Sequence, residues 1–180
     1  SHVIPQILEA LPEAIEKGLR VPLVYNCGGY DRVSALTLLD GIVDIYMPDF
    51  KFWDSQVADQ MCGTPDYPER ARKAFREMHR QVGDLQIDSK GIAACGLLVR
   101  HLVMPEGLAG TNAVLKFLAN EMGKNTYVNI MDQYRPCGDA IGKPHIGRRI
   151  THNEYVEALQ MAQDLGLTRL DKRLRSWLFL

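Results

Sequence analysis

The chain has 180 residues, of which 46% are hydrophobic and 24% are charged, and its formal net charge is -1. This composition suits one globular domain, and the near-neutral charge gives no overall field that would attract nucleic acid or an anionic membrane. No apolar run approaches the roughly 20 residues that span a bilayer, and the first residues lack the pattern of a signal peptide. We therefore expect a cytoplasmic protein with no nucleic-acid or membrane partner.

The first part of the chain alternates between helical and extended patterns. Residues 5–18 carry apolar side chains at helical spacing, residues 21–26 suit a short strand, and residues 33–39 suit a second helix. A turn with two glycines, Gly28 and Gly29, separates the strand from the second helix. Short connections between alternating helices and strands indicate a parallel sheet built from βα units, and so an α/β fold.

A strongly apolar segment at residues 41–53 ends in a polar motif. Its β-branched and aromatic residues suit a buried strand, and Asp49 and Lys51 follow at the carboxyl end. Because side chains alternate between the two faces of a strand, Asp49 and Lys51 point the same way. Ligands of parallel α/β folds collect at the carboxyl ends of strands, which makes this motif a candidate site. A plain surface ion pair is the alternative.

Two helices are predicted after this motif. Asp54 can cap a short helix over residues 55–61, while Asp66 and Glu69 have the spacing of a capping box for a helix over residues 67–82. The longer helix is rich in arginine and lysine. Acidic residues interrupt its basic face and no aromatic residues interleave, so we do not assign it to nucleic acid.

The next predicted strand, residues 96–104, contains two adjacent basic residues, Arg100 and His101, which must point to opposite faces. Burying an unpaired charge is costly. We therefore expect Arg100 to face a polar lumen or an anion, or else to pair with a carboxylate such as Asp49 for structure alone. A helix over residues 111–122 then leads to a last strand over residues 126–131.

The carboxyl-terminal part contains a loop, a helix and a tail. Gln133 and Tyr134 follow the last strand, and residues 137–149 form a polar loop that could cover a site. Thr151 and Glu154 predict a capping box for a helix ending near residue 165, and residues 169–180 are interpreted as an extra strand or packing arm.

Four successive strands thus carry polar residues near their carboxyl ends: Asn26, then Asp49 with Lys51, then Arg100, then Gln133 with Tyr134. This pattern favours an α/β enzyme that recognises an anionic or zwitterionic ligand. A Schiff-base lyase using Lys51 is a weaker reading, because the nearby Asp49 favours the charged ammonium. No catalytic residue is assigned. No metal site is assigned either, because the four cysteines have no metal-binding spacing; they are Cys27, Cys62, Cys95 and Cys137.

From about Val3 to Asp171 the chain resembles the radical S-adenosylmethionine proteins similar to the activating enzyme of pyruvate formate-lyase. Five segments carry the resemblance in order and spacing: VYNCGGYD, DGIVDIYMPDFKFWD, EMHRQVGDL, GLLVRHLVMP and TYVNIMDQYRP. The resemblance implies an incomplete TIM-like barrel truncated at its amino terminus. Residues 1–180 would form its carboxyl-terminal part, with βα units over about 1–136 and a loop, helix and packing tail over 137–180.

Such proteins bind a [4Fe-4S] cluster through a CxxxCxxC loop and use it to cleave S-adenosylmethionine to a 5'-deoxyadenosyl radical. This sequence contains no CxxxCxxC, so the chain alone cannot hold the cluster in the family manner. The resemblance places Asn26, Arg100 and Tyr134 on the cofactor side and Asp49 and Lys51 on the substrate side. It also implies a glycyl-radical enzyme or a small molecule as substrate, and flavodoxin or ferredoxin as electron donor. The alternative is a catalytically inert fragment or interaction module.

Overall fold

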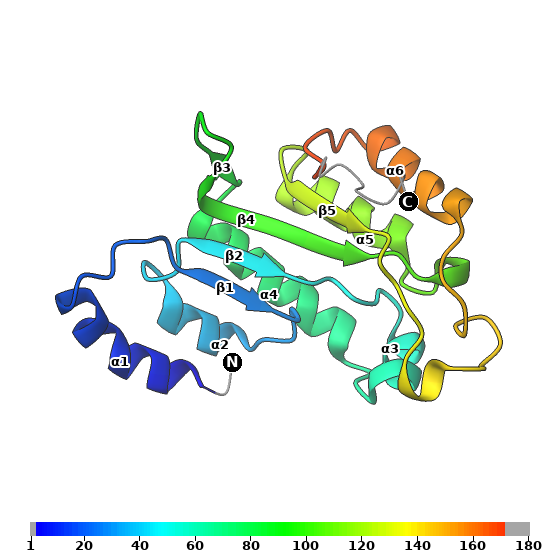
Figure 1. The fold of residues 1–180 in the computed structure, drawn as a ribbon, viewed down its shortest axis with the longest axis horizontal. Coiled ribbons are helices and arrows are strands. Elements are labelled where there is room, and N and C mark those ends of the chain that lie inside the picture. The colour runs from blue at the N-terminus through cyan, green and yellow to red at the C-terminus, as the bar shows by residue number, and fades with distance from the viewer. Residues whose placement is uncertain (1–2, 172–180) are drawn as a thin grey trace, which may run out of the picture.

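The computed structural model describes residues 3–171 and contains one sheet (Figure 1). Its strands are β1 (Val24–Cys27), β2 (Ile45–Pro48), β3 (Gln86–Ile87), β4 (Ala93–Leu102) and β5 (Tyr127–Met131). β1, β2, β4 and β5 run parallel and lie side by side in that order, while β3 pairs antiparallel with the start of β4. Leu170 adds an isolated parallel bridge to Val128 on the outer side of β5. The predicted parallel α/β sheet is confirmed.

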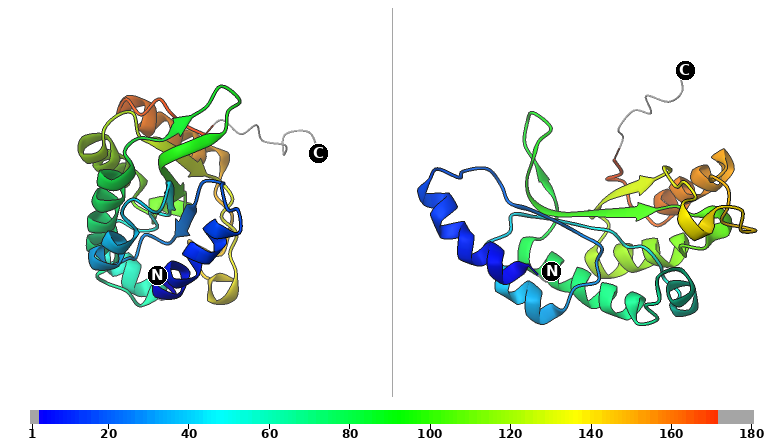
Figure 2. Two further views of the ribbon diagram at one scale, coloured as in Figure 1. Left: turned by 90° about the vertical axis from the view of Figure 1, so that its left-hand side faces the viewer. Right: turned by 60° about the horizontal axis from the view of Figure 1, so that its bottom comes forward.

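Six helices flank these strands within residues 3–171: α1 (Ile4–Glu16), α2 (Val33–Leu36), α3 (Ser55–Cys62), α4 (Tyr67–Val82), α5 (Thr111–Phe117) and α6 (His152–Asp164). A π-helical turn, Leu118–Met122, continues α5, and short 3₁₀ turns lie at Thr37–Leu39, Pro105–Gly107 and Gly138–Ala140. Figure 2 shows the strands lining the inside of an arc of helices. Parallel strands in chain order with their helices on one side have the architecture of a barrel segment, whereas a doubly wound sheet has helices on both faces.

The two faces of the sheet differ in burial, and the alternation of side chains along each strand determines which residues lie on which face. On the helical side the buried side chains include Tyr46, Leu97 and Val128, which pack with residues of α4 and α5 such as Phe75 and Leu115. The opposite, concave face is covered by no helix of the described part (Figure 2). Apart from the buried Ile45, its side chains are partly buried or exposed; they include Val24, Asn26, Met47, Leu98, Leu102 and Met131. Ligand-accessible side chains are therefore those of the concave face.

Predicted helix caps have mixed outcomes. The Asp54 carboxylate accepts bonds from the amides of Gln56 and Val57 at 2.8 and 3.0 Å, which confirms it as the cap of α3. The capping box of α6 at Thr151 is also formed. The predicted capping box of α4 is wrong, because the Asp66 carboxylate makes no cap bond.

Asp66 instead accepts a bond from the Tyr30 hydroxyl at 2.5 Å and pairs with Arg70. These stronger partners, one of them remote in sequence, displace the local contact with the backbone. Of the predicted tail, residues 172–180 lie outside the described residues. Between residues 3 and 171, no helix has the length and apolar character needed to cross a membrane.

Candidate functional site

Polar side chains from three strands meet at the carboxyl end of the sheet. Asp49, just after β2, forms a parallel bridge with Arg100 of β4, and Asn26 of β1 lies opposite Met47 of β2 in the register. Because Met47 and Asp49 are two positions apart, they share a face, and Asn26 and Arg100 emerge on the same face. The parallel register thus brings Asn26, Asp49 and Arg100 together on the concave side.

A chain of hydrogen bonds links the four polar residues. The Arg100 guanidinium donates from Nε to Asp49 Oδ1 at 2.7 Å and from Nη2 to Asn26 Oδ1 at 2.8 Å. Lys51 Nζ donates to the other Asp49 oxygen, also at 2.7 Å. The Asp49 side chain is 19% exposed and that of Lys51 44%, so the carboxylate is shielded while the ammonium faces solvent. Two cations share one carboxylate here, and the excess positive charge suits an anionic ligand group.

A pocket of about 220 Å³ opens beside these charges. Asp49, Lys51 and Arg100 form its polar side, and its remaining lining residues are Phe50, Phe52, Leu102, Met104, Met131 and Gln133. The pocket combines an apolar wall with a few polar groups, as ligand sites commonly do. This arrangement fits a ligand with an anionic or zwitterionic head and an apolar body. It also disfavours the Schiff-base reading, because the Lys51 ammonium is engaged by Asp49.

Tyr134 is not brought to this pocket. Its hydroxyl donates to the main-chain oxygen of Ile146 at 2.9 Å and so fastens the loop over residues 137–149, of which Ile146 is buried. Its neighbour Gln133 lines the pocket instead. The structure therefore unites Asn26, Asp49, Lys51 and Arg100, while Tyr134 lies among the residues that hold the loop.

His101, which was not assigned to the site, supports it from the helical side. The fully buried ring places Nδ1 at 2.8 Å from the Phe50 carbonyl oxygen and Nε2 at 2.9 Å from Thr111 Oγ1. A carbonyl can only accept, so Nδ1 carries the hydrogen and Thr111 donates to Nε2. Desolvation by burial lowers the pKa of His101 to about 4, so the ring is neutral at pH 7. The neutral ring fixes Phe50, which lies between Asp49 and Lys51.

Tyr67 is a second residue that sequence reasoning missed. Its hydroxyl lies 2.9 Å from the main-chain oxygens of both Gly28 and Asp49, and it accepts a bond from the Lys51 amide at 2.8 Å. Burial raises the pKa of this hydroxyl, so it keeps its proton. The sequence predicts Tyr67 only as the start of a helix, because nothing local indicates its contacts with residues 16 to 39 positions away.

The cysteines do not offer a cluster site. All four are free and scattered over the fold, and among residues 3–171 no group of three His, Cys, Asp or Glu side chains could hold a metal ion. Desolvation by burial, followed by the charge of Asp31, raises the pKa of the Cys27 thiol. Thiolates are the ligands of iron-sulfur clusters. The residues present in the described part therefore do not fit such a cluster.

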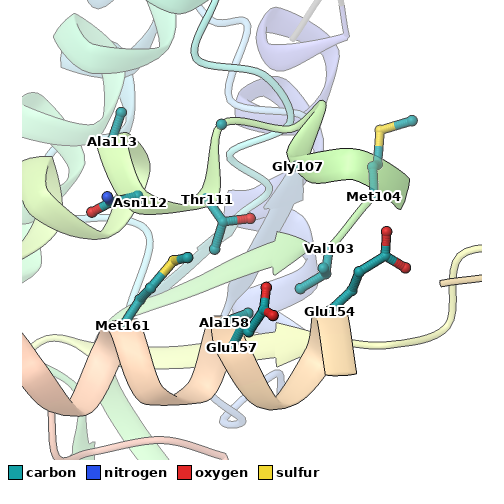
Figure 3. Close-up of a pocket in the computed structure, with 11 residues that line it drawn as sticks. Val103, Met104, Gly107, Thr111, Asn112, Ala113, Glu154, Glu157, Ala158 and Met161 are labelled. Carbon is teal, nitrogen blue, oxygen red and sulfur yellow. The ribbon is translucent and has the colours of Figure 1, made fainter. Parts of the chain in front are cut away.

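A second pocket, of about 280 Å³, lies between the end of β4, the start of α5 and α6 (Figure 3). Figure 3 shows Met161 and Glu157 rising from α6 toward Thr111 and Val103. None of the predicted site residues lines it, but Met104 lines both pockets. We therefore retain the first pocket as the candidate site.

The basic face of α4 is largely neutralised by partners. Arg72 stacks over the Trp53 ring at 4.7 Å from its centroid, and the other cations form ion pairs. These pairs are Arg70 with Asp66, Lys73 with Glu69, Arg76 with Glu121, and Arg80 with both Asp40 and Glu77. The charges of this helix are thus engaged within the chain.

These features define the class of fold, an incomplete parallel βα barrel with a polar cluster at the carboxyl ends of its strands. The chain shares this fold with a solved domain of pyruvate-formate lyase-activating enzyme from Bacteroides vulgatus ATCC 8482. The TM-score is 0.63 and the sequence identity 15%, and the likeness covers 91% of this chain and 88% of that domain.

An uncharacterized protein of Methanocaldococcus jannaschii is 30% identical over 164 residues, which are 91% of this chain and 44% of that protein. The chain therefore spans less than half the length of this curated relative. No family model matches the sequence.

Proposed function

We propose that this chain forms the carboxyl-terminal part of a radical S-adenosylmethionine enzyme of the glycyl-radical-enzyme-activating type. It contributes walls of the cofactor and substrate site. The observation that carries the proposal is the hydrogen-bonded cluster of Asn26, Asp49, Lys51 and Arg100 on the concave face of the sheet. The shared fold with the activating-enzyme domain and the five sequence segments support the same assignment.

In this proposal Arg100 and Asn26 face S-adenosylmethionine, and Asp49 and Lys51 face the substrate. The excess positive charge of the cluster suits the carboxylate of the cofactor, and the apolar wall of the pocket suits an uncharged portion of the ligand. The proposal also keeps the Tyr134 ring beside the adenine, outside the pocket that Arg100 lines, while its hydroxyl holds the Ile146 carbonyl. S-adenosylmethionine supplies the radical chemistry in that family.

The proposal assigns the cluster ligands to polypeptide other than the described residues. The length of the archaeal relative, of which this chain spans 44%, is consistent with such additional polypeptide. We propose that residues 1–180 are the carboxyl-terminal part of the enzyme, with βα units over about residues 1–136 and a loop, helix and packing tail over 137–180. A glycyl-radical enzyme or a small molecule is then the substrate, flavodoxin or ferredoxin is the electron donor, and the chain alone is inactive.

The recognition of the anionic head can be tested on the 180-residue chain by calorimetry. We expect S-adenosylmethionine to bind about tenfold more tightly than 5'-methylthioadenosine, which lacks the amino and carboxylate groups, since one charge-assisted contact has about this value. Arg100→Gln should remove the preference. Arg76→Gln, which affects an ion pair on the outer face of α4, should retain it. Equal binding of the two compounds by the unaltered chain contradicts the proposal.

The cluster is tested in a longer polypeptide. We expect a longer polypeptide that includes an upstream CxxxCxxC segment to absorb light at about 400 nm after anaerobic reconstitution, as thiolate-ligated clusters do. Lack of this absorbance would end the radical-enzyme assignment.

The second candidate is an interaction module without chemistry. Within the described residues β1 has a hydrogen-bonded neighbour on one side only, and Val24 on this strand is 53% exposed. On α1, Ile7 and Ile15 are 47% and 46% exposed. An unpaired strand edge beside apolar side chains favours association. Self-association in sedimentation, without binding of S-adenosylmethionine, would support this candidate. A compact monomer that binds S-adenosylmethionine tightly would contradict it.

A further inference from the structure

We propose that Tyr67 is a positioning residue of the site, and that its hydroxyl holds Asp49 and Lys51 against the end of β1. What these two residues bind rests on the function proposed above, but the positioning itself does not. Tyr67 is the first residue of α4, and it is only 4% exposed. Its side chain reaches the point where the main chains after β1 and β2 separate.

The hydroxyl takes the place of a main-chain hydrogen bond between the segments that follow β1 and β2. The last direct bond between the two segments runs from the Asp49 amide to the Cys27 carbonyl at 2.9 Å. Two residues further on, the Lys51 amide donates to the Tyr67 oxygen at 2.8 Å, and that oxygen lies 2.9 Å from the Gly28 carbonyl. The side chain therefore joins the two main chains where they no longer join each other directly.

The hydrogen count shows how the hydroxyl serves three main-chain groups. Its oxygen has lone pairs for the Lys51 amide, and its single hydrogen is shared between the carbonyls of Gly28 and Asp49. All three partners are backbone atoms. Replacing Tyr67 by phenylalanine would preserve the ring and leave these groups without the hydroxyl, so the effect of the oxygen can be measured alone.

Close packing around the hydroxyl leaves little room for another arrangement. Gly29 has φ of +74°, and a Cβ atom placed there would lie 2.7 Å from the Asp49 carbonyl oxygen and 3.5 Å from the Tyr67 oxygen. The Tyr67 ring also packs edge-on against the rings of Phe50 and Phe52, with centroids 6.4 and 6.2 Å apart. The turn after β1 and the segment after β2 therefore converge on Tyr67.

His101 also holds residues 49–51, through the carbonyl group of Phe50. It bonds the Phe50 oxygen, whereas Tyr67 bonds the main-chain groups of Asp49 and Lys51. With both contacts in place, the peptide groups from 49 to 51 have fixed directions, and the Asp49 and Lys51 side chains point to the concave face. Removing the Tyr67 hydroxyl should release one of these two restraints.

Tyr46 provides a matched control. It is a buried tyrosine of β2, and its hydroxyl donates to Gln81 Oε1 at 2.6 Å. Tyr46→Phe therefore removes a part-buried hydroxyl bond between β2 and α4, whereas Tyr67→Phe removes bonds between α4 and the residues just after β1 and β2. The control does not touch residues 49–51.

The test measures how readily a limiting amount of acetic anhydride acetylates Lys51 in the full chain, with Lys73 as internal reference and mass spectrometry as readout. Lys73 is an exposed partner of Glu69 on α4. Because local release loosens the bond that holds the Lys51 ammonium on Asp49, we expect the Lys51/Lys73 ratio to rise about threefold in Tyr67→Phe. The ratio should not change in Tyr46→Phe. An unchanged ratio in Tyr67→Phe, or an equal rise in both variants, would overturn the proposal.

Hydrogen exchange in the unaltered protein keeps the proposal testable if Tyr67→Phe does not fold. The Lys51 amide should exchange as slowly as ladder amides of β2 such as Met47. Exchange as fast as in an exposed loop would overturn the positioning role.

Calorimetry separates this inference from the proposed function. Slow Lys51 exchange together with no binding of S-adenosylmethionine would reject the function and support the positioning. Binding of the cofactor together with fast Lys51 exchange would support the function and reject the positioning. If both hold, Tyr67→Phe should weaken binding about fivefold, because the same side chains would then be held less rigidly.

Discussion

Asp49 Oδ1 lies 2.7 Å from Arg100 Nε, although the two residues are 51 positions apart in the sequence. They are neighbours because β2 and β4 are adjacent parallel strands and the register continues one step beyond the end of β2. Their side chains are 19% and 24% exposed, so the pair is partly shielded from water. The contact therefore joins two strand ends as well as forming the polar side of the pocket.

The first prediction concerns this carboxylate. Asp49→Asn leaves Lys51 and Arg100 as two cations without their shared partner, and we expect it to lower the free energy of unfolding by about 1–2 kcal/mol, discounted for partial exposure. Urea unfolding at low and high sulfate measures the change, and sulfate should reduce it. Glu69→Gln, at an exposed pair with Lys73, is the control and should show little effect. An equal loss in both variants would argue against a special role of Asp49.

The second prediction concerns pH. Burial lowers the pKa of His101 from an ordinary value of about 6.5 to about 4, so the unfolded chain binds more protons than the folded one between these values. This contribution to stability is fully present above about pH 6.5 and is lost as the pH falls toward 4, to a total of about 3 kcal/mol. Urea unfolding at pH 7, 5.5 and 4 should show a steeper decline in the wild type than in His101→Gln. Parallel declines would refute the assignment.

The third prediction compares two glycines with similar backbone angles. Gly29 and Gly41 have φ of +74° and +76°, but a Cβ atom at Gly29 would meet the Asp49 carbonyl oxygen at 2.7 Å, whereas one at Gly41 would meet nothing within 4 Å. Gly41→Ala should cost about 1 kcal/mol for the backbone conformation alone. Gly29→Ala should cost about 1–3 kcal/mol more through the close contact. Thermal unfolding of both variants checks the difference, and equal losses would count against a tight approach at Gly29.

The fourth prediction concerns the start of α6. The Glu154 carboxylate accepts bonds from the amides of Thr151 and Glu106 and pairs with Arg148, while the Thr151 hydroxyl accepts a bond from the Glu154 amide at 3.2 Å. The ion pair with Arg148 is the leading cause of a lowered Glu154 pKa. Thr151→Ala should lower the free energy of unfolding by about 1 kcal/mol, and Glu154→Gln by a similar or larger amount. Circular dichroism during urea unfolding measures both, and Glu157→Gln should leave the curve near that of the wild type.

Much of the concave cluster could be predicted from the sequence because two simple rules determine it, the alternation of side chains along a strand and the alignment of adjacent parallel strands. Alternation along the strand puts Asp49 and Lys51 on one face and separates Arg100 from His101. Adjacent parallel strands then bring their carboxyl ends together, so Asn26 joins the same group. These rules need only the order of the elements.

The remaining parts depend on contacts that no local pattern encodes. Tyr67 binds main-chain atoms up to 39 positions away, and the Asp66 cap fails because Tyr30, 36 positions away, occupies the carboxylate. Tyr134 follows a strand end as a pocket residue would, yet its hydroxyl bonds the loop at Ile146. In each case the partner is a backbone or side-chain atom whose position is known only after the helices have packed on the sheet.

Met104 forms a wall common to the pocket beside Arg100 and the hollow between α5 and α6. Methionine is unbranched and rotates about several bonds, so its thioether can swing without a large energetic penalty. We therefore expect a ligand that moves Met104 in one hollow to change the shape of the other.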